Sequence, residues 1–256
     1  MSPRVGALSQ AAYVLHRYDW SESSVIVDLF TREGGRVAVA AKGAKRPTSN
    51  LRAVLIPFQR IQVGFTRAVR DDASASDIRT LRSAEWGGGT PLRGGAALLS
   101  GFYLNELLMK LLARDDPHPV LWDAYGATLP LLGGADEAAA LRAFELTLLA
   151  QTGHLPDLAH STVTQHGVDA VRTYELRPDV GLVPQSGADE LGIAGADWLA
   201  LQTAVGRADI AALRQACAPG EPALRRQLRR CLAYHLGGAP LRTREVVHDL
   251  QPLLTA

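Results

Sequence analysis

The chain has 256 residues, with 27 Lys and Arg against 26 Asp and Glu, and two cysteines. A hydrophobic fraction of 47% and a charged fraction of 21% are ordinary for a folded protein. They exclude disorder, collagen and coiled coil as descriptions of the whole chain. Cys217 and Cys231 are too few for a disulfide scaffold, so we expect two buried thiols in a reducing compartment.

The most apolar stretch, residues 96–113, is interrupted by Asn105, Glu106 and Lys110. That interruption favours an amphipathic helix over a membrane span. The N-terminal residues contain no hydrophobic core of a signal peptide. We therefore expect a cytoplasmic protein without a membrane partner.

The net charge of +1 hides an uneven distribution of charge along the chain. Residues 1–85 carry 13 basic and 8 acidic side chains, residues 86–206 carry 6 and 14, and residues 207–256 carry 8 and 4. Basic ends around an acidic middle indicate an anionic ligand, most commonly nucleic acid. Chance clustering of solvated charges is the alternative.

Residues 12–85 predict five short β-strands with a hairpin turn at 32–35. The fourth strand is expected to contain Phe58, Ile61, Val63 and Phe65, with a possible bulge near 59–60. Five strands in this length suit a small closed barrel, and an OB-fold is the natural candidate for residues 1–86. An SH3-like barrel fits the pattern nearly as well.

Residues 90–256 predict a mainly helical body, so the fold class is α+β. The first helix should begin near Pro91 and bury one face, composed of Leu98, Phe102, Asn105, Leu108, Met109 and Leu112. Asp136 is expected to cap a later helix. The segment at about 154–190 reads as irregular, with a possible hairpin at 172–184. The other expected helices are 120–132, 137–152, 196–205, 208–217 and 223–236.

Basic side chains concentrate at the end of the third predicted strand and in the polar connection after it, namely Lys42, Lys45, Arg46, Arg52 and Arg60. Cations on an exposed loop can neutralise the phosphates of nucleic acid. Trp20, Phe58 or Phe65 could stack on bases, although aromatic residues of a small barrel are more often core. The alternative is a loop whose charges only maintain solubility.

The last predicted helix carries an arginine ladder opposite a buried stripe that includes Leu224, Leu228, Cys231, Leu232 and Leu236. Arg225 lies four residues before Arg229, and Arg226 lies four residues before Arg230. Like charges at this spacing repel each other unless a nearby acidic group compensates them. That group could belong to DNA, to a partner, or to the acidic middle of this chain.

Arg142 lies at the edge of an apolar helix face that contains Leu141 and Phe144. An arginine beside an apolar groove can hold a carboxylate of a partner peptide. The alternative is an intrahelical ion pair with Glu145.

Metal binding and catalysis have little support in the sequence. His154, His160 and His166 are spaced by six residues, and no cysteine precedes Cys217. Neither a phosphate-binding glycine loop nor a hydrolase or metalloprotease motif occurs. We therefore expect no metal, no cofactor and no catalytic residue. An enzyme with a site in 154–190 is the alternative.

Three ordered groups of residues resemble the RecO family of recombination mediators. The first is WSESSVIVDLFTREGGRVAVAAKGAKR with IPFQRIQVGF and TLRSAEW. LLSGFYLNELLMKLL and LRAFELTLLAQTGHLPDL follow, and then YHLGGAPLRTRE. Many members carry a four-cysteine zinc site in the segment that corresponds to 160–187. This chain has no cysteine there, so the resemblance is to the branch that lacks zinc.

The resemblance implies an N-terminal OB-fold and a helical body that together bind single- and double-stranded DNA and anneal complementary strands without ATP. It also implies binding to the acidic C-terminal tail of the single-stranded DNA-binding protein (SSB), partnership with RecR, and indirect loading of RecA at gaps, hence association with the nucleoid. Arg225 and Arg229 would join the five barrel cations in binding DNA. The candidate tail site combines Arg142, Leu141, Phe144, Tyr103 and Leu107. A general single-strand-binding OB protein without dependence on SSB is the alternative.

Overall fold

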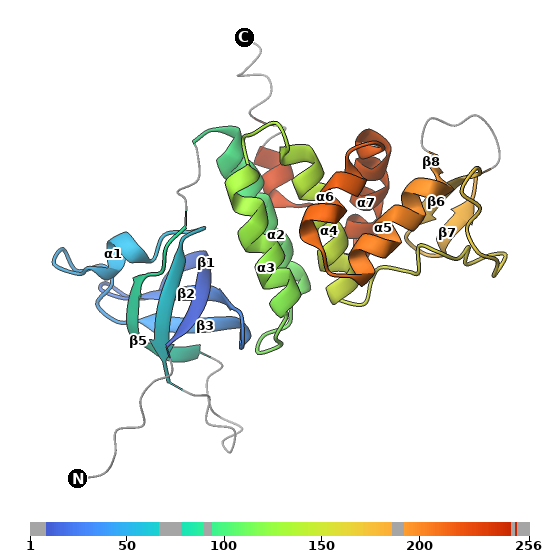
Figure 1. The fold of residues 1–256 in the computed structure, drawn as a ribbon. Helices are drawn as coiled ribbons and strands as arrows, with labels where there is room; N and C mark the ends of the chain where they lie inside the picture. Colours follow the sequence, from blue (N-terminus) through green and yellow to red (C-terminus); the bar gives the residue numbers. More distant parts are fainter. Residues whose placement is uncertain (1–8, 67–77, 90–93, 186–191, 247–248, 250–256) are drawn as a thin grey trace, which may run out of the picture. The chain divides into compact units, whose positions relative to one another are not determined.

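A computed structural model describes residues 9–66, 78–89, 94–185, 192–246 and 249. Five strands close into a barrel in the order β1-β2-β3-β5-β4 (Figure 1). All neighbours are antiparallel except β3 and β5. The predicted OB-fold-like barrel is therefore confirmed. The strands are β1 (Gln10–Asp19), β2 (Val25–Thr31), β3 (Gly35–Ala41), β4 (Arg60–Phe65) and β5 (Ile78–Trp86), with the short helix α1 (Leu51–Val54) between β3 and β4.

Alternation along the strands fills the inside of the barrel, because successive side chains of a strand point to opposite faces. On β2 and β3 the inward positions are all apolar and at most 2% exposed, and they are Val25, Val27, Leu29, Val37, Val39 and Ala41. Partly buried Leu51 and Val54 of α1 pack against the same core. The connection between β3 and β4 is thereby anchored to the barrel.

Phe58 does not belong to the fourth strand, contrary to the prediction. β4 begins at Arg60, and Phe58 has a φ of 72°, a left-handed conformation that breaks an extended strand. Its amide donates a hydrogen bond to the Val14 carbonyl at 3.0 Å, which fixes the turn before β4. The shifts in strand register lie between Val14 and His16 and between Gly64 and Phe65, not near residues 59–60.

The chain returns to the barrel after the first long helix. The compact unit that contains the barrel consists of residues 1–92 and 112–122. The Asp115 amide donates to the Arg36 carbonyl at 3.0 Å, and the Trp122 indole donates to the Phe30 carbonyl at 3.1 Å. We call Leu112–Trp122 the barrel strap. Gly35 permits its approach, because it has a φ of 66° and any Cβ there would overlap the Asp116 carbonyl.

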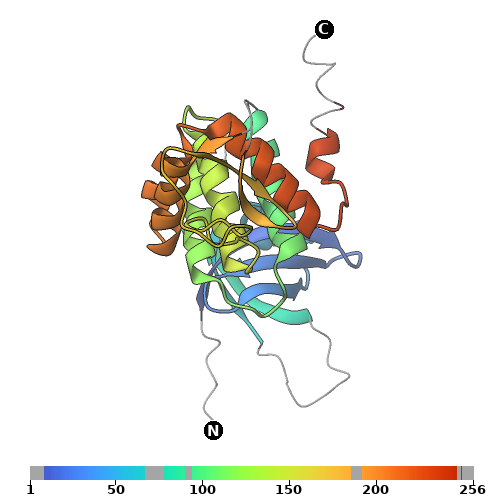
Figure 2. The ribbon, with the colours of Figure 1, turned by 90° about the vertical axis from the view of Figure 1, so that its right-hand side faces the viewer.

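The second unit, residues 93–111 and 123–256, is helical around α4. α4 packs against α6 and α7, and α5 packs against α6 (Figure 1). The confirmed hairpin of β6 and β7 gains β8, and α7 lies along β6 (Figure 2). The helices are α2 (Ala96–Leu111), α3 (Pro119–Thr128), which continues from the strap, η1 (Leu129–Leu131), α4 (Glu137–Gln151), α5 (Gly195–Gly206), α6 (Ile210–Cys217) and α7 (Glu221–His235). The strands are β6 (Thr173–Arg177), β7 (Gly181–Pro184) and β8 (Ile193–Ala194).

Two local predictions for this unit are wrong in part. The predicted buried face of α2 is right for Asn105, Leu108 and Leu112 but not for Phe102, which is 39% exposed, and the helix buries Ala97, Gly101, Leu104 and Leu107 instead. Asn105 is buried because it accepts a hydrogen bond from the Tyr125 hydroxyl at 2.6 Å. The Asp136 side chain does not cap α4, since its carboxylate pairs with Arg214 instead. The predicted helix start at Pro91 lies outside the described residues.

Both cysteines are buried and unpaired, as predicted. Burial raises the pKa of the Cys217 thiol to about 12 and that of the Cys231 thiol to about 11. Within the described part of the chain, no helix is long and apolar enough to span a membrane.

Candidate nucleic-acid interface

The loop after β3 is tied to the turn between β1 and β2. The Lys45 amide donates to the Ser23 carbonyl at 3.0 Å, and its Nζ donates to the Ser21 carbonyl at 2.9 Å. The same Nζ pairs with the Asp19 carboxylate at 2.9 Å. Lys45 therefore joins two connections that are distant in sequence into one surface, and its ammonium forms a solvent-exposed ion pair with Asp19.

Trp20 belongs to this joined surface. It lies between Asp19 and Ser21, the two residues that Lys45 contacts, and it is 54% exposed. Lys42 and Arg46, on the facing loop, are exposed and form no ion pair with a described residue. An exposed indole beside two uncompensated cations is an arrangement suited to stacking a base and neutralising phosphates. We call Trp20, Lys42, Lys45 and Arg46 the barrel-loop surface.

The other two aromatic candidates are packed into the barrel. Phe58 is 8% exposed. Phe65 packs against the barrel core, and its ring lies 5.2 Å from the Arg79 guanidinium. Phe65 is only partly exposed, so of the three aromatic residues considered from the sequence Trp20 is the one that is more than half exposed.

Arg52 and Arg60 differ in their surroundings. Arg52 is exposed on α1. Two successive backbone hydrogen bonds, from the Ser49 amide to the Arg46 carbonyl and from the Arg52 amide to the Ser49 carbonyl, connect the loop to this helix. The Arg60 guanidinium lies over the Trp122 ring at 5.2 Å, and its Nε is buried without a hydrogen-bond partner. Arg60 therefore packs under the barrel strap and extends no cation toward the barrel-loop surface.

Arg225 and Arg229 are exposed on α7, and neither forms an ion pair with a described residue. Burial, the nearby Arg244 and Arg225 all lower the pKa of Arg229. Arg230 forms an ion pair with Glu175 of β6, which belongs to the acidic middle of the chain. Compensation by the acidic middle of this chain, one of the alternatives for the arginine ladder, therefore applies to Arg230. It does not apply to Arg225 and Arg229, whose charges stay uncompensated.

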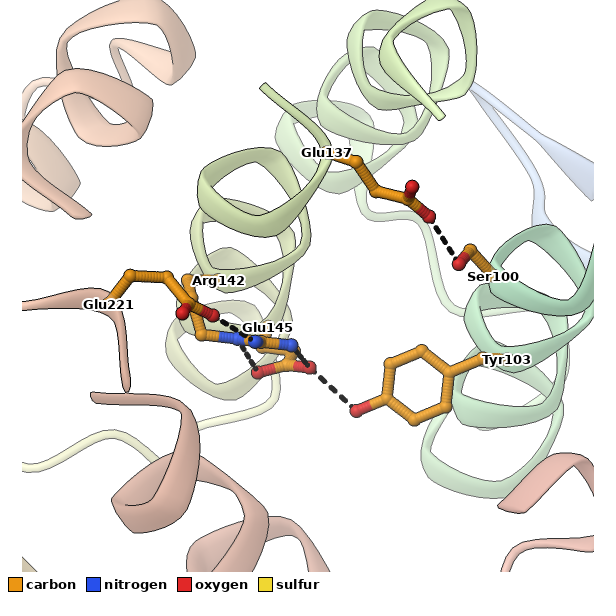
Figure 3. A network of polar contacts seen from close by, with 6 residues as sticks. All are labelled: Ser100, Tyr103, Glu137, Arg142, Glu145 and Glu221. Atoms are coloured by element: carbon orange, nitrogen blue, oxygen red, sulfur yellow. Dashed lines mark hydrogen bonds and ion pairs between the residues drawn. The ribbon is translucent and has the colours of Figure 1, made fainter. Parts of the chain in front are cut away.

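Arg142 occupies the centre of a buried polar network (Figure 3). It is 5% exposed, donates to Glu145 through Nε at 2.8 Å and Nη2 at 2.6 Å, and donates to Glu221 through Nη1 at 2.8 Å. The Tyr103 hydroxyl donates to Glu145 at 2.6 Å. Burial would lower the pKa of Arg142, but Glu145, together with Tyr103 and Glu221, raises it above its ordinary value. Burial and the same carboxylate raise the pKa of Tyr103.

Of the five residues predicted to bind the SSB tail, Arg142 and Tyr103 are joined through Glu145, and most of the five are covered. Leu107 and Phe144 are fully buried, and Leu141 is partly buried. Arg142 already faces two carboxylates, Glu145 and Glu221. The sequence spacing reveals the first of these pairs. It cannot reveal the second, because Glu221 lies 79 residues away.

Sequence reasoning missed Arg244 as a neighbour of Tyr103. Its guanidinium lies 5.8 Å from the centre of the Tyr103 ring. It also borders a pocket of about 360 Å³ whose apolar lining includes Leu236, Pro240 and Leu241. The only signal in the sequence is an arginine in TRE at 243–245, shortly after the glycine pair at 237–238, and it indicates no partner by itself.

No group of three His, Cys, Asp or Glu side chains that could hold a metal ion occurs among the described residues. His160 pairs with Asp157, and the His154 ring packs at a tilt against the His235 ring, with ring centres 4.2 Å apart.

Residues 5–86 match the family model described as Recombination protein O N terminal, and residues 93–245 match Recombination protein O C terminal. The chain belongs to the RecO family. Relatives named DNA repair protein RecO include one from Polaromonas sp. (strain JS666 / ATCC BAA-500), 48% identical over 98% of both chains. Another, from Variovorax paradoxus (strain S110), is 48% identical over 95% of this chain and 96% of its own. Membership in this family supports a role in recombinational DNA repair.

Proposed function

We propose that this protein is a non-enzymatic recombination mediator that binds single- and double-stranded DNA and anneals complementary strands. The barrel-loop surface is the observation that carries the proposal. It places exposed Trp20 beside Lys42 and Arg46 on an OB-fold-like barrel, in a chain of the RecO family.

In this proposal Lys42, Arg46 and Arg52 neutralise phosphates, and Trp20 stacks on a base. Lys45 acts mainly by holding the two connections together, since its ammonium already pairs with Asp19. Annealing requires no active site. A cationic surface that holds two strands raises their local concentration and screens the repulsion between their phosphates.

The proposal includes binding to the acidic tail of SSB, action with RecR, and loading of RecA at gaps. The tail needs a cation beside an apolar surface. Arg142 would have to leave Glu145 and Glu221 to provide it. Arg244 lies near the Tyr103 ring and borders a mostly apolar pocket, which Glu245 and Asp249 also line, so the tail would have to compete with these two carboxylates. We therefore expect Arg244→Gln to weaken binding of a tail peptide while the protein stays folded.

The decisive experiment is annealing of two complementary oligonucleotides, bare or coated with cognate SSB, without ATP. Acceleration of both supports the mediator. Acceleration of bare strands only favours a general single-strand-binding protein and removes the SSB tail from the proposal. Folded protein that accelerates neither at low salt refutes the proposed function.

A variant pair tests the surface. Lys42→Gln with Arg46→Gln should reduce the slope of log K against log salt for single strands by about 1.4, since each lost phosphate contact removes about 0.7. Trp20→Ala should weaken binding by about 1–3 kcal/mol, and Trp20→Phe should restore most of it. The double variant Arg172→Gln and Arg207→Gln loses the same charge from exposed positions elsewhere and serves as the control.

A further inference from the structure

α7 presents a second cationic surface, on the unit that does not contain the barrel. The helix buries Leu224, Leu228, Cys231 and Leu232, together with Gln227, along one side. The remaining arc is exposed and contains the residues Arg225, Arg226, Arg229, Arg230 and Tyr234. We call these five residues the α7 arginine face. At 1.5 Å per residue they extend over about 14 Å of the helix.

Acidic side chains of the same unit leave much of this face uncompensated. Glu221, at the start of α7, is held by Arg142, and Glu175 is held by Arg230. Glu106 receives hydrogen bonds from Thr243 and an ion pair from Lys110. These contacts occupy the nearby carboxylates without reaching Arg225 or Arg229.

The spacing of Arg225 and Arg229 makes this arrangement unfavourable for the isolated protein. They lie one turn apart, and like charges at that spacing repel. Arg244, which follows α7 in the chain, adds a further cation close to Arg229. A bound polyanion removes this repulsion and releases counterions as it binds.

Tyr234 indicates which polyanion fits. It lies on the exposed arc beyond Arg226 and Arg230, at successive intervals of four residues, and it is 57% exposed. Its ring stands edge-on to His235, with ring centres 5.2 Å apart and planes at 87°. An exposed aromatic ring in line with arginines offers a nucleobase a stacking surface next to cations for the phosphates. An acidic peptide would use the arginines but not the ring.

We propose that the α7 arginine face binds single-stranded nucleic acid separately from the barrel-loop surface, so that one molecule holds two strands. This inference rests on the proposed function and adds a second strand site to it. Arg225 and Arg229 contact phosphates, Tyr234 stacks on a base, and Arg230 is partly withheld by Glu175.

Full-length protein is titrated with a labelled 20-nucleotide oligothymidine at several salt concentrations, and saturation gives the number of strands bound. Wild type should bind two strands. Arg225→Gln with Arg229→Gln should bind one, as should the barrel variant Lys42→Gln with Arg46→Gln. Tyr234→Ala should weaken the α7 site about tenfold, and Tyr234→Phe should not. The glutamine substitutions remove a repulsive pair, so loss of binding cannot be attributed to loss of the helix.

Each outcome decides between the alternatives. If wild type binds no oligonucleotide, the proposed function fails and this inference fails with it. If wild type binds one strand, lost with the barrel variant and kept with the α7 variant, the α7 site is refuted and the proposed function stands. In a last experiment, binding of a labelled glutamate-rich peptide to the wild type and to the α7 variant is measured. If the α7 variant loses the peptide and keeps both strands, the face serves an acidic protein segment and the inference is overturned.

Discussion

Replacing Arg142 with alanine is expected to destabilise the helical unit strongly. Glu145 is 2% exposed, and among the described residues Arg142 donates two hydrogen bonds to its carboxylate and Tyr103 donates a third. After truncation only the neutral Tyr103 hydroxyl remains to solvate a buried charge. Removing one partner of a buried ion pair in this way costs about 3–5 kcal/mol. For a domain of this size that corresponds to a fall in Tm of roughly 6–20 °C.

Urea denaturation followed by circular dichroism measures the effect as a shift of the midpoint at unchanged slope. The double variant Arg142→Met and Glu145→Gln removes both charges and keeps an acceptor for Tyr103, so it should recover much of the loss. Glu221→Gln, which changes a more exposed partner, should cost about 1 kcal/mol. A loss below about 1 kcal/mol for Arg142→Ala, or a double variant no more stable than the single one, would refute this reasoning.

Three further predictions follow from the packing of single residues. Gly35→Ala should lower the free energy of unfolding by more than about 2 kcal/mol, because a positive φ is combined with overlap on the Asp116 carbonyl; thermal melting measures it. Cys217 and Cys231 should react with a thiol reagent at about pH 8 at least ~100-fold more slowly in folded than in unfolded protein, since burial raises both pKa values. Burial and then His154 lower the pKa of His235, so stability should fall as pH drops through about 6.5, and His235→Gln should flatten that fall.

Simple controls accompany these tests. Gly206→Ala, where an added Cβ meets nothing within 4 Å, should melt like wild type. Rapid labelling of both thiols in folded protein, or an unchanged acid profile in His235→Gln, would contradict the burial on which the other two predictions depend.

The order of strands and helices could be predicted because it depends on local patterns. Alternating apolar residues gave β2 and β3, and the 3.6-residue period gave α4 and α7. The left-handed Phe58 could not be predicted, since an aromatic residue before a hydrophobic run favours a strand.

In the candidate sites, too, features that depend on local sequence could be predicted and contacts between distant residues could not. The exposure of Arg46 agrees with its polar neighbours in sequence, and Lys42 is exposed where β3 ends at Ala41. The tie from Lys45 to Asp19, the packing of Arg60 on Trp122, and the pairing of Arg142 with Glu221 join residues that are distant in sequence. Pattern reasoning cannot reveal such contacts, because they exist only once the chain has folded.

The barrel strap makes the N-terminal unit discontinuous along the chain. During synthesis the five strands leave the ribosome well before Trp122, whose indole bonds to the Phe30 carbonyl and whose ring lies 5.0 Å from that of Tyr13. The outer side of β1 to β3 therefore stays uncovered while the first long helix is made, a period in which exposed strands favour aggregation. A chimaera that exchanges barrels between relatives would likewise have to carry residues 112–122 with the strands, or lose the cover that the native barrel receives.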